Sequence, residues 1–320
     1  MTTRTSSSGR PPPDPERDAR QFTLANSSHR SHTVHCTPAC AGATPTPPKN
    51  GTALLTRLHA DGVAARAAYR DPHTTAQVIE SGGQAVTLDM AMPDTIGPAL
   101  DGIEAVFLLG ATGPAQTTHE LNILEAVRAV GVRVVKLSVW RADEGLSPIA
   151  RLHQPVEQSL VTSDVAWTIL RPNFYLQNFL RQPSIREARE FSLPLITAPI
   201  SFIDSGDIAR VAARVLTTDG HDGCVYDLTG PKALTYAEAA EEFSDVLGKP
   251  VRYVGLPDDE ARAAMLGRGM PEFYVDALIG VARAYRDGGA ETVTSTVADL
   301  TGRAALGFAD FVRQNRNFFD

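Results

Sequence analysis

The residues best suited to chemistry lie on a predicted strand over 132–139 and just beyond it. Lys136 and Ser138 are two positions apart, so both side chains point to the same face of that strand. Both can bind an oxygen of a bound molecule, although Lys136 can equally be a strand-end lysine that reaches solvent. His153 follows in the next segment and can pass a proton, because an imidazole titrates near neutral pH. Ser138, Lys136 and His153 are therefore the catalytic candidates.

A helix expected around 156–162 decides how His153 can act. Glu157 stands four residues after His153 and can orient the imidazole if both lie on the helix. Proline suits the first turn of a helix, so Pro155 indicates that the helix begins at Gln154 or Pro155, which weakens that pairing. The alternative is that His153 has a structural role, in which it forms a hydrogen bond at the start of the helix.

A further polar group follows the next apolar run, at 165–170. Asn173 comes after Pro172, where its amide can contact the carboxamide of a cofactor or a substrate. The aromatic residues beyond it can wall an apolar pocket for a flat or quinone-like molecule, with Tyr175 as a reserve proton donor. Ordinary packing of a short helix explains these side chains equally well. They are Phe174, Tyr175 and Phe179.

Alternating strands and helices place these polar groups at one edge of a sheet. The apolar runs at 132–139 and 165–170 are typical of parallel strands buried on both faces, and the helix between them makes a βαβ crossover. Repetition of this unit at about twenty to thirty residues predicts an α/β fold, a Rossmann-type doubly wound parallel sheet. Such sheets bind ligands at the carboxyl ends of their strands. Further helices are expected over 52–62, 74–83, 94–102 and 119–131, further strands over 63–69, 84–89 and 103–110, and a helix capping box at Thr235 and Glu238.

Composition and charge limit the class of protein. With 320 residues and 43% hydrophobic content, the chain can bury a large core. A net charge of -7 argues against direct binding of nucleic acid. Three cysteines are too few for a disulfide scaffold, and no apolar run suits a membrane span or a secretory signal. We therefore expect a cytoplasmic protein that acts on a small-molecule substrate. Cys36 and Cys40, with only His32 and His35 nearby, do not predict a metal site.

The first fifty residues differ in composition from the rest. They are rich in Ser, Thr, Pro and Arg, and residues 1–35 are expected to form a disordered tail. A strand and a glycine-rich turn are expected directly before the helix at Thr52. The residues there that resemble a phosphate-binding loop are Gly42, Ala43, Thr44 and Gly51.

Residues 45–48 interrupt this loop with three prolines. Proline offers no N–H to a phosphate and cannot adopt the positive φ that glycine supplies. Two explanations stay open. Either the loop is a lengthened variant, or the residues upstream of Gly51 are not the natural partner of this domain, as after a shifted reading frame or a misplaced start.

The residues at the ends of the second, third and fourth strands indicate that the site binds a dinucleotide. Arg70 ends the second strand about twenty residues after the expected glycine turn, where an acidic residue would bind the ribose of NAD and an arginine accommodates the 2′-phosphate of NADP. We therefore expect NADP(H) in preference to NAD(H); the alternative is a solvated loop arginine. Leu109 and Gly110 end the fourth strand, where a small residue lets the backbone approach the adenosine. Asp89 ends the third strand and can cap the turn that follows it.

Within the stretch from roughly Gly51 to Phe319, over which the resemblance extends, seven sequence blocks stand in a characteristic order: AYRDP, ALDGIEAVFLL, AVGVRVVKLSV, HxxxEQSL, WTILRPNFYLQNF, SFIDSGDIARVAARVL and YDLTGPKALTYAEAA. In this order they resemble the NmrA-like and isoflavone-reductase-like branch of atypical short-chain dehydrogenases, particularly its bacterial quinone- or azo-reductase-like members. The resemblance implies a Rossmann core, a smaller C-terminal part that covers the substrate pocket, and Asp89 as a carboxylate at the adenine edge. Ser138 matches the family's serine. His153 and Glu157 stand where short-chain dehydrogenases have Tyr and Lys, which removes the usual proton donor.

These observations together predict an NAD(P)-binding domain over 36–320, with a core over about 51–182 and a C-terminal part over about 183–320. The expected function is NADP(H)-dependent reduction of a small conjugated, quinone-like or azo-type acceptor, in which the nicotinamide carries the chemistry. Two alternatives stay open. One is a non-catalytic NADP sensor that signals through a protein partner, and the other is a pseudo-enzyme with a damaged phosphate loop.

Overall fold

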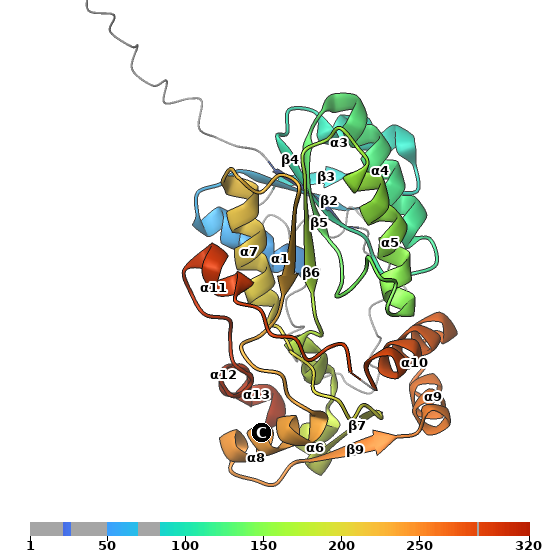
Figure 1. The fold of residues 1–320 in the computed structure, drawn as a ribbon, viewed down its shortest axis with the longest axis vertical. Helices are drawn as coiled ribbons and strands as arrows, with labels where there is room; N and C mark the ends of the chain where they lie inside the picture. The colour runs from blue at the N-terminus through green and yellow to red at the C-terminus, as the bar shows by residue number, and fades with distance from the viewer. Residues whose placement is uncertain (1–21, 27–49, 70–83, 287) are drawn as a thin grey trace, which may run out of the picture.

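A parallel sheet forms the centre of the protein in this computed structural model, which describes residues 22–26, 50–69, 84–286 and 288–320 (Figure 1). Within these residues seven strands pair in the order β3-β2-β1-β4-β5-β6-β8. The chain reverses its direction of winding between β1 and β4, which is the arrangement of a doubly wound Rossmann sheet, so the predicted fold class is confirmed. The strands are β1 (Phe22–Asn26), β2 (Ala65–Tyr69), β3 (Gln84–Thr87), β4 (Ala105–Leu109), β5 (Arg133–Leu137), β6 (Trp167–Pro172) and β8 (Cys224–Leu228).

Helices cover both faces of this sheet (Figure 1). On one face lie α1 (Asn50–Ala60), α7 (Ser205–Thr217) and α11 (Thr296–Thr301). On the other lie α3 (Ile96–Leu100), with the short turn η3 (Pro93–Thr95) before it, α4 (Gln116–Val130) and α5 (Pro148–Val161). The alternation along β5 assigns its residues to these layers: Val135 and Leu137 pack in the α1–α7 core, and Val134 packs in the α3–α5 core. Lys136, two residues after Val134, therefore faces α4 and α5.

The first strand lies further upstream than the sequence predicts. β1 spans Phe22–Asn26, within the segment expected to be a disordered tail, and not in the stretch directly before Thr52. It occupies the centre of the sheet because it pairs in parallel with both β2 and β4, where Phe22 is opposite Ala65 and Ala105. The prediction of a tail was therefore wrong for these five residues. The other residues of that tail, and the helix expected over 74–83, lie outside the described residues.

Helix α5 begins earlier than Pro155 suggests. Ser147 is its N-cap, whose hydroxyl accepts a hydrogen bond from the N–H of Ala150, and Pro148 takes the first helical position. Pro155 lies inside the helix, so the expected start at Gln154 or Pro155 was wrong. A capped first turn with a proline at N1 is the stronger start signal, and it puts His153 and Glu157 on one continuous helix.

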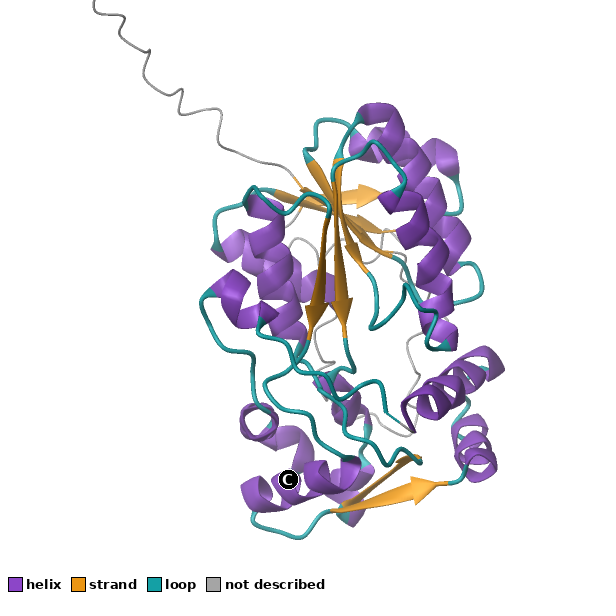
Figure 2. Cartoon of the chain, viewed as in Figure 1, coloured by secondary structure: helices purple, strands orange, loops and turns teal. Residues whose placement is uncertain are grey.

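A second part of the molecule faces the carboxyl ends of the strands, toward which the arrowheads of β6 and β8 point in Figure 2. Its core is aromatic, and Phe179 lies in edge-on contact with Phe202, Phe243 and Phe308. Its elements are η4 (Leu176–Arg181), α6 (Ser184–Ala188), β7 (Glu190–Pro194), α8 (Tyr236–Leu247), β9 (Arg252–Leu256), α9 (Asp258–Gly267), α10 (Glu272–Arg286), α12 (Phe308–Gln314) and α13 (Arg316–Phe319).

The boundary predicted at residue 182, between the Rossmann core and the C-terminal part, only partly matches the structure. Helix α7 and strand β8 come after residue 182, yet they pack on and pair with the Rossmann sheet. The C-terminal part is therefore built from two stretches of chain, one on each side of the α7–β8 unit. The predicted capping box at the start of α8 is confirmed, since Thr235 and Glu238 bond each other's backbone N–H groups.

Candidate active site

A buried polar network lies at the carboxyl edge of the sheet, between β5, β6 and α5. The hydroxyl of Ser138 donates a hydrogen bond of 2.5 Å to Glu157 Oε1. Arg171, near the end of β6, donates to the same carboxylate through Nε at 3.1 Å and Nη2 at 2.6 Å. Ser138 and Glu157 are almost completely buried. The two-pronged guanidinium contact holds the Glu157 carboxylate in one orientation and neutralises it where it meets Ser138.

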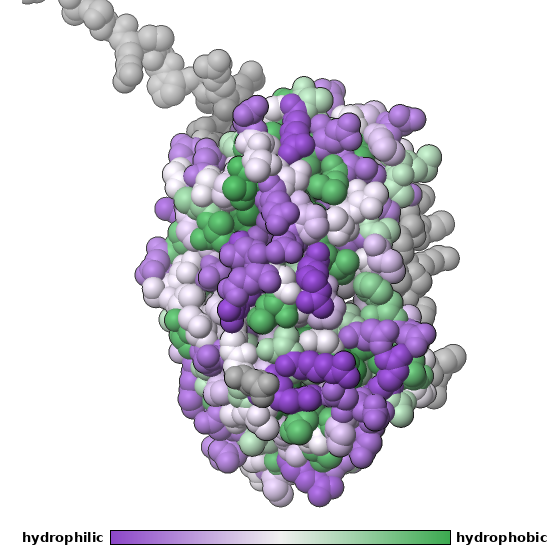
Figure 3. Space-filling model, turned by 45° about the vertical axis from the view of Figure 1, so that its right-hand side comes forward, coloured by the Kyte–Doolittle hydropathy of each residue, from purple (hydrophilic) through white to green (hydrophobic). Residues whose placement is uncertain are grey.

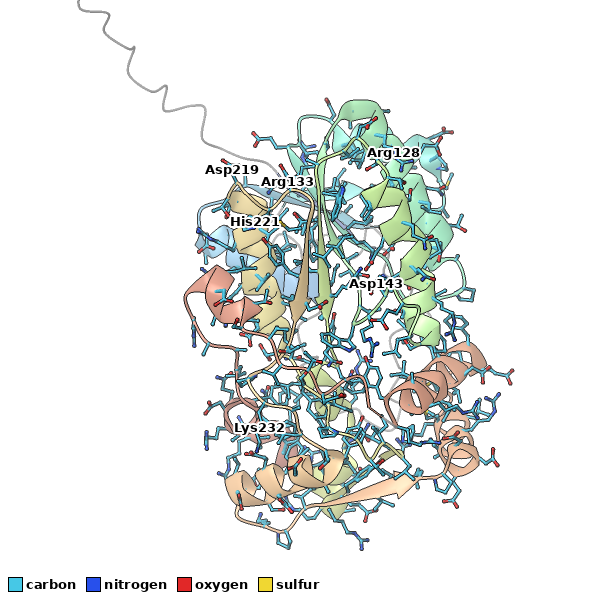
Figure 4. The ribbon with its side chains drawn as sticks, viewed as in Figure 1. Arg128, Arg133, Asp143, Asp219, His221 and Lys232 are labelled. Carbon is cyan, nitrogen blue, oxygen red and sulfur yellow. The ribbon has the colours of Figure 1, made fainter. Side chains whose placement is uncertain are left out.

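Further carboxylates surround Arg171. Asp143, in the loop between β5 and α5, forms an ion pair with its Nη1 at 3.0 Å, and Figure 4 shows Asp143 close to the end of α5 that faces the C-terminal part. Asp227 lies opposite Arg171 on β8. Burial raises the pKa of Asp227, and the negative charges of Asp143 and Glu157 act in the same direction, while Arg171 opposes them. Arg171 thus joins the end of β6 to the loop before α5 through Asp143 and to the middle of α5 through Glu157.

Lys136 takes part in a second buried group. Its ammonium donates to Glu120 Oε1 at 2.9 Å and to the carbonyl oxygen of Leu137, and both charged side chains are fully buried. The same Glu120 oxygen accepts the backbone N–H of Gly110 at 2.8 Å. Burial lowers the pKa of Lys136, while the ion pair with Glu120 opposes that shift. The alternative of a strand-end lysine that reaches solvent was therefore wrong. Lys136 and Ser138 do face the same layer, as predicted.

His153 lies beside this group and not beside Glu157. Its ring nitrogen Nε2 is 2.9 Å from the side-chain nitrogen of Gln116, on α4. Burial, and then the nearby charge of Lys136, lower the pKa of His153 well below its usual range. The expectation that this imidazole titrates near neutral pH was wrong, because the desolvated ring stays neutral there. The expected orientation by Glu157 is not what the structure has, since that carboxylate serves Ser138 and Arg171.

Asn173 joins the two parts of the molecule. Its side-chain amide donates to Ser201 Oγ and to the carbonyl oxygen of Ala290, both at 2.8 Å, and its oxygen accepts the N–H of Phe174 at 2.8 Å. These bonds support a structural role more directly than the predicted contact with a cofactor. Phe179 is likewise a core residue, almost fully buried.

The predicted cofactor-binding residues fall into two groups. Gly42, Ala43, Thr44 and Arg70 lie outside the described residues. Among the others, Asp89 Oδ1 accepts the N–H of Ala91 at 2.9 Å, so Asp89 caps the turn after β3. Leu109 ends β4 opposite Asn26, the last residue of β1, and Gly110 follows it.

The residues at the junction of β1 and β4 fit a dinucleotide. Gly51 is buried in the first turn of α1, which contains no Asp or Glu. The N–H groups of a first turn have no partner within their own helix, so they can bind a phosphate. Gly110 leaves the end of β4 without a side chain at the point where the strand order reverses, and open α/β sheets bind their ligands there. The Ser138–Glu157–Arg171 network lies further along the same edge, at the next two strands, β5 and β6.

Sequence reasoning did not select Glu120, Gln116, Arg171 or Asp143. A signal for two of them exists in α4, where Gln116 and Glu120 share the buried side with Ile123, Leu124 and Val127. A polar residue on the apolar side of a helix requires a buried partner. The identity of that partner depends on the fold, since Lys136 and His153 come from other elements.

The opposite edge of the sheet carries a separate cluster. Arg133 and His221 lie near the far ends of the strands, well away from Asp143 in Figure 4. Arg133 donates to backbone carbonyl oxygens at the end of α7, which is a structural role.

The part of the chain that the structure describes has no group of three or more side chains able to hold a metal ion, and Cys36 and Cys40 lie outside it. None of the described helices is long and apolar enough to cross a membrane. On the face drawn in Figure 3, apolar side chains are scattered among hydrophilic ones.

The known proteins that this chain resembles include NAD(P)H-binding reductases. The model of a family described as NAD(P)H-binding matches residues 49–219. An NAD(P)H azoreductase from Xenophilus azovorans is 33% identical over 272 residues, which are 84% of this chain and 95% of the relative. Quinone oxidoreductase 2 from Escherichia coli is 30% identical over 217 residues, or 67% of this chain and 76% of that protein. The crystal structure of an NADPH-dependent quinone oxidoreductase from Escherichia coli complexed with NADPH has the same fold, with a TM-score of 0.78 and 24% identity over 92% of this chain and 100% of that one.

Proposed function

Because the chain belongs to the NAD(P)H-binding family, we propose that it is an NADPH-dependent reductase of quinone-like, azo-type or similarly conjugated acceptors. The resemblance to NmrA-like atypical short-chain dehydrogenases is confirmed by these relatives. One observation carries the proposal: a hydroxyl with a fixed carboxylate partner stands at the end of β5, the neighbour of the strand β4 at which the sheet reverses its winding, on the edge that faces the C-terminal part. The acceptor classes are those that the names of the relatives give.

The dinucleotide would lie along the carboxyl edge. The first turn of α1 with Gly51 would hold its phosphates, the backbone at Leu109 and Gly110 would border its adenosine half, and Ser138 would stand at its nicotinamide end. When bound, the nicotinamide supplies the hydride. The chain has to orient the acceptor, exclude water and supply a hydrogen-bond partner for the reduced group.

Ser138 is the residue that we place in contact with the reacting molecules. Its proton lies between Ser138 Oγ and Glu157 Oε1, and Arg171 keeps that carboxylate paired if the hydroxyl turns toward an acceptor. Lys136 and His153 are positioning residues in this proposal, because both are buried and bonded to α4. Lys136 acts through Glu120 on the turn at Gly110, and His153 holds α5 against Gln116.

The preference for NADPH over NADH rests on Arg70, the residue directly after β2. In Rossmann sheets this position contacts the adenosine ribose, and an arginine there binds a 2′-phosphate. Arg70→Ala should raise the Kd for NADPH at least about tenfold, which is about 1.4 kcal/mol, and change the Kd for NADH little. Equal weakening of both dinucleotides would overturn this preference. Arg57→Ala, in an exposed pair with Asp61 on α1, is the control for a general loss of positive charge.

Turnover tests the proposed function directly. NADPH should bind saturably, as followed by its fluorescence, and should be oxidised when a panel of quinones and azo dyes is added. Saturable binding without oxidation by any acceptor would overturn the reductase proposal in favour of an NADP sensor. Absence of binding, with recovery after residues 45–48 are rebuilt as a glycine turn, would identify a damaged phosphate loop.

A further inference from the structure

Helices α9 and α10 form a pair with a small core of their own. Four buried apolar side chains join them, namely Ala261, Met265, Val275 and Ile279. Ion pairs bind the helices along their length: Arg262 pairs with Glu272 at 2.6 Å and with Asp276, and Arg283 pairs with Asp258 at 2.7 Å. The two helices are therefore held to each other independently of the aromatic core of the C-terminal part.

One end of this pair is firmly attached. Helix α9 starts two residues after β9 ends, and Arg286, the last residue of α10, donates to the carbonyl oxygen of Leu195 at 3.0 Å. Just beyond α10, the carbonyl oxygen of Gly289 accepts Trp140 Nε1 at 2.7 Å, and that of Ala290 accepts the amide of Asn173 at 2.8 Å. We call this end the base of the pair. Asn173 therefore anchors the base.

The other end reaches the carboxyl edge of the sheet. The connection between α9 and α10, residues 268–271, lies at this end, which we call the tip. Tyr274, in the first turn of α10, donates its hydroxyl hydrogen to the carbonyl oxygen of Thr112, in the turn after β4. Burial raises the pKa of Tyr274, so its hydroxyl stays protonated and remains a donor.

A second contact lies between tip and base. Gly280 packs against Pro148 at the start of α5 so closely that a Cβ on Gly280 would come within 2.3 Å of the proline ring. Helix α10 thus runs from the turn after β4 past the start of α5, and in Figure 1 it lies below the end of α5 that faces the C-terminal part. Thr112, which Tyr274 contacts, stands two residues after Gly110, and Trp140, which bonds Gly289 just beyond α10, stands two residues after Ser138. Both ends of α10 are therefore attached to the turns that follow β4 and β5.

We propose that α9 and α10 form a cap over the nicotinamide end of the site, and that Tyr274 is a positioning residue that latches the tip of this cap to Thr112. This inference rests on the proposed function, since it takes NADPH to bind at this edge. Within the residues that the structure describes, several hydrogen bonds hold the base, and the Tyr274 hydroxyl bonds the tip to the turn after β4. The cap therefore opens from the tip, and opening is the step that releases the dinucleotide and exchanges the acceptor.

Tyr274→Phe tests the latch, because it keeps the ring and removes the hydroxyl. A hydrogen bond contributes about 0.5–1.5 kcal/mol, so the rate of NADPH dissociation should rise by about two- to tenfold. The KM values for NADPH and for the acceptor should rise by more than kcat changes. Tyr253→Phe is the matched control: its hydroxyl donates to the carbonyl oxygen of Pro194 at 3.1 Å, away from the cap's tip. It should leave the dissociation rate unchanged.

A measurement without cofactor separates this inference from the proposed function. Hydrogen exchange at the backbone amides of residues 268–275 should be faster in Tyr274→Phe than in the wild type, and unchanged in Tyr253→Phe. Gly280→Ala should also accelerate it, because the added methyl group has to push α10 away from Pro148. Unchanged exchange in both Tyr274→Phe and Gly280→Ala would overturn the latch whether or not NADPH binds. If exchange accelerates while dissociation of bound NADPH stays the same, the latch does not gate the site and the inference fails.

Discussion

Ser138 donates its hydroxyl hydrogen to Glu157 across 2.5 Å, from the end of β5 to the middle of α5. A serine bonded in this way can accept a hydrogen bond from a bound amide or hydroxyl. To donate one to a carbonyl or azo group, it has to leave Glu157, which remains paired with Arg171. The pair therefore provides a donor that can be switched between two partners without leaving a buried carboxylate uncompensated.

Ser138→Ala should lower turnover at least about tenfold, about 1.4 kcal/mol of transition-state stabilisation, while the affinity for NADPH changes much less. The reason is that the hydroxyl is the polar group nearest the reacting atoms in the proposed site. Steady-state kinetics with one quinone and one azo acceptor measures the effect. Ser163→Ala, which removes a hydroxyl bonded to Leu160 at the far end of α5, is the control. Equal kcat in Ser138→Ala and wild type would show that Ser138 does not take part.

Lys136→Met should destabilise the protein by about 3–5 kcal/mol, because it leaves the fully buried Glu120 carboxylate without its cation. The double variant Lys136→Met with Glu120→Gln should recover much of that loss, since no buried charge is then unpaired. Urea denaturation of both single variants and the double variant gives the coupling. If the loss of unfolding free energy in the double variant equals the sum of the losses in the two single variants, the two side chains do not act as a pair. The double variant should still bind NADPH more weakly than the wild type if the Gly110 turn needs the charged pair.

Gly110→Ala should reduce both stability and NADPH affinity. A Cβ on Gly110 would come within 2.6 Å of Glu120 Oε1 and 2.9 Å of Glu120 Cγ, and that side chain is buried and paired with Lys136. The expected loss is about 1–3 kcal/mol. Gly267→Ala at the exposed end of α9 is the comparison, because nothing lies within 4 Å of the added methyl group. A Gly110→Ala protein as stable as Gly267→Ala would contradict the close approach.

Acid should destabilise the protein partly through His153. Its pKa is lowered by burial in the folded state, so as the pH falls the unfolded chain gains a proton that the folded chain does not. The stability that this residue contributes is present above the unfolded-state pKa and is lost progressively below it. His153→Gln should make the unfolding free energy fall less steeply between about pH 7 and about pH 5. His59→Gln, on the exposed side of α1, is the control. An unchanged slope in His153→Gln would contradict a buried neutral imidazole.

Local sequence patterns were sufficient to predict many of the helices and strands. The apolar runs of β4, β5 and β6 and the capping box at Thr235 correspond to structure at the predicted places. The start of α5 was misjudged because Pro155 can stand in a first turn or inside a helix, and sequence alone does not weigh it against Ser147 and Pro148. The position of β1 was missed because a central strand is defined by its two neighbours, and the polar segment around Phe22–Asn26 gives no periodicity long enough to reveal it.

The sequence by itself determined the class of fold, the family, and the edge of the sheet at which the candidate site lies. These depend on patterns within each element and on their order, which are local along the chain. Only the tertiary structure decided what Ser138, Lys136, His153 and Asn173 do. Their partners Glu157, Glu120, Gln116 and Ala290 come from other elements, between 16 and 117 residues away. A buried polar side chain must find a partner, but which one it finds depends on how the elements pack. For that reason Ser138, a catalytic candidate in the sequence, is bonded to Glu157, which the sequence offered only as one possible partner of His153.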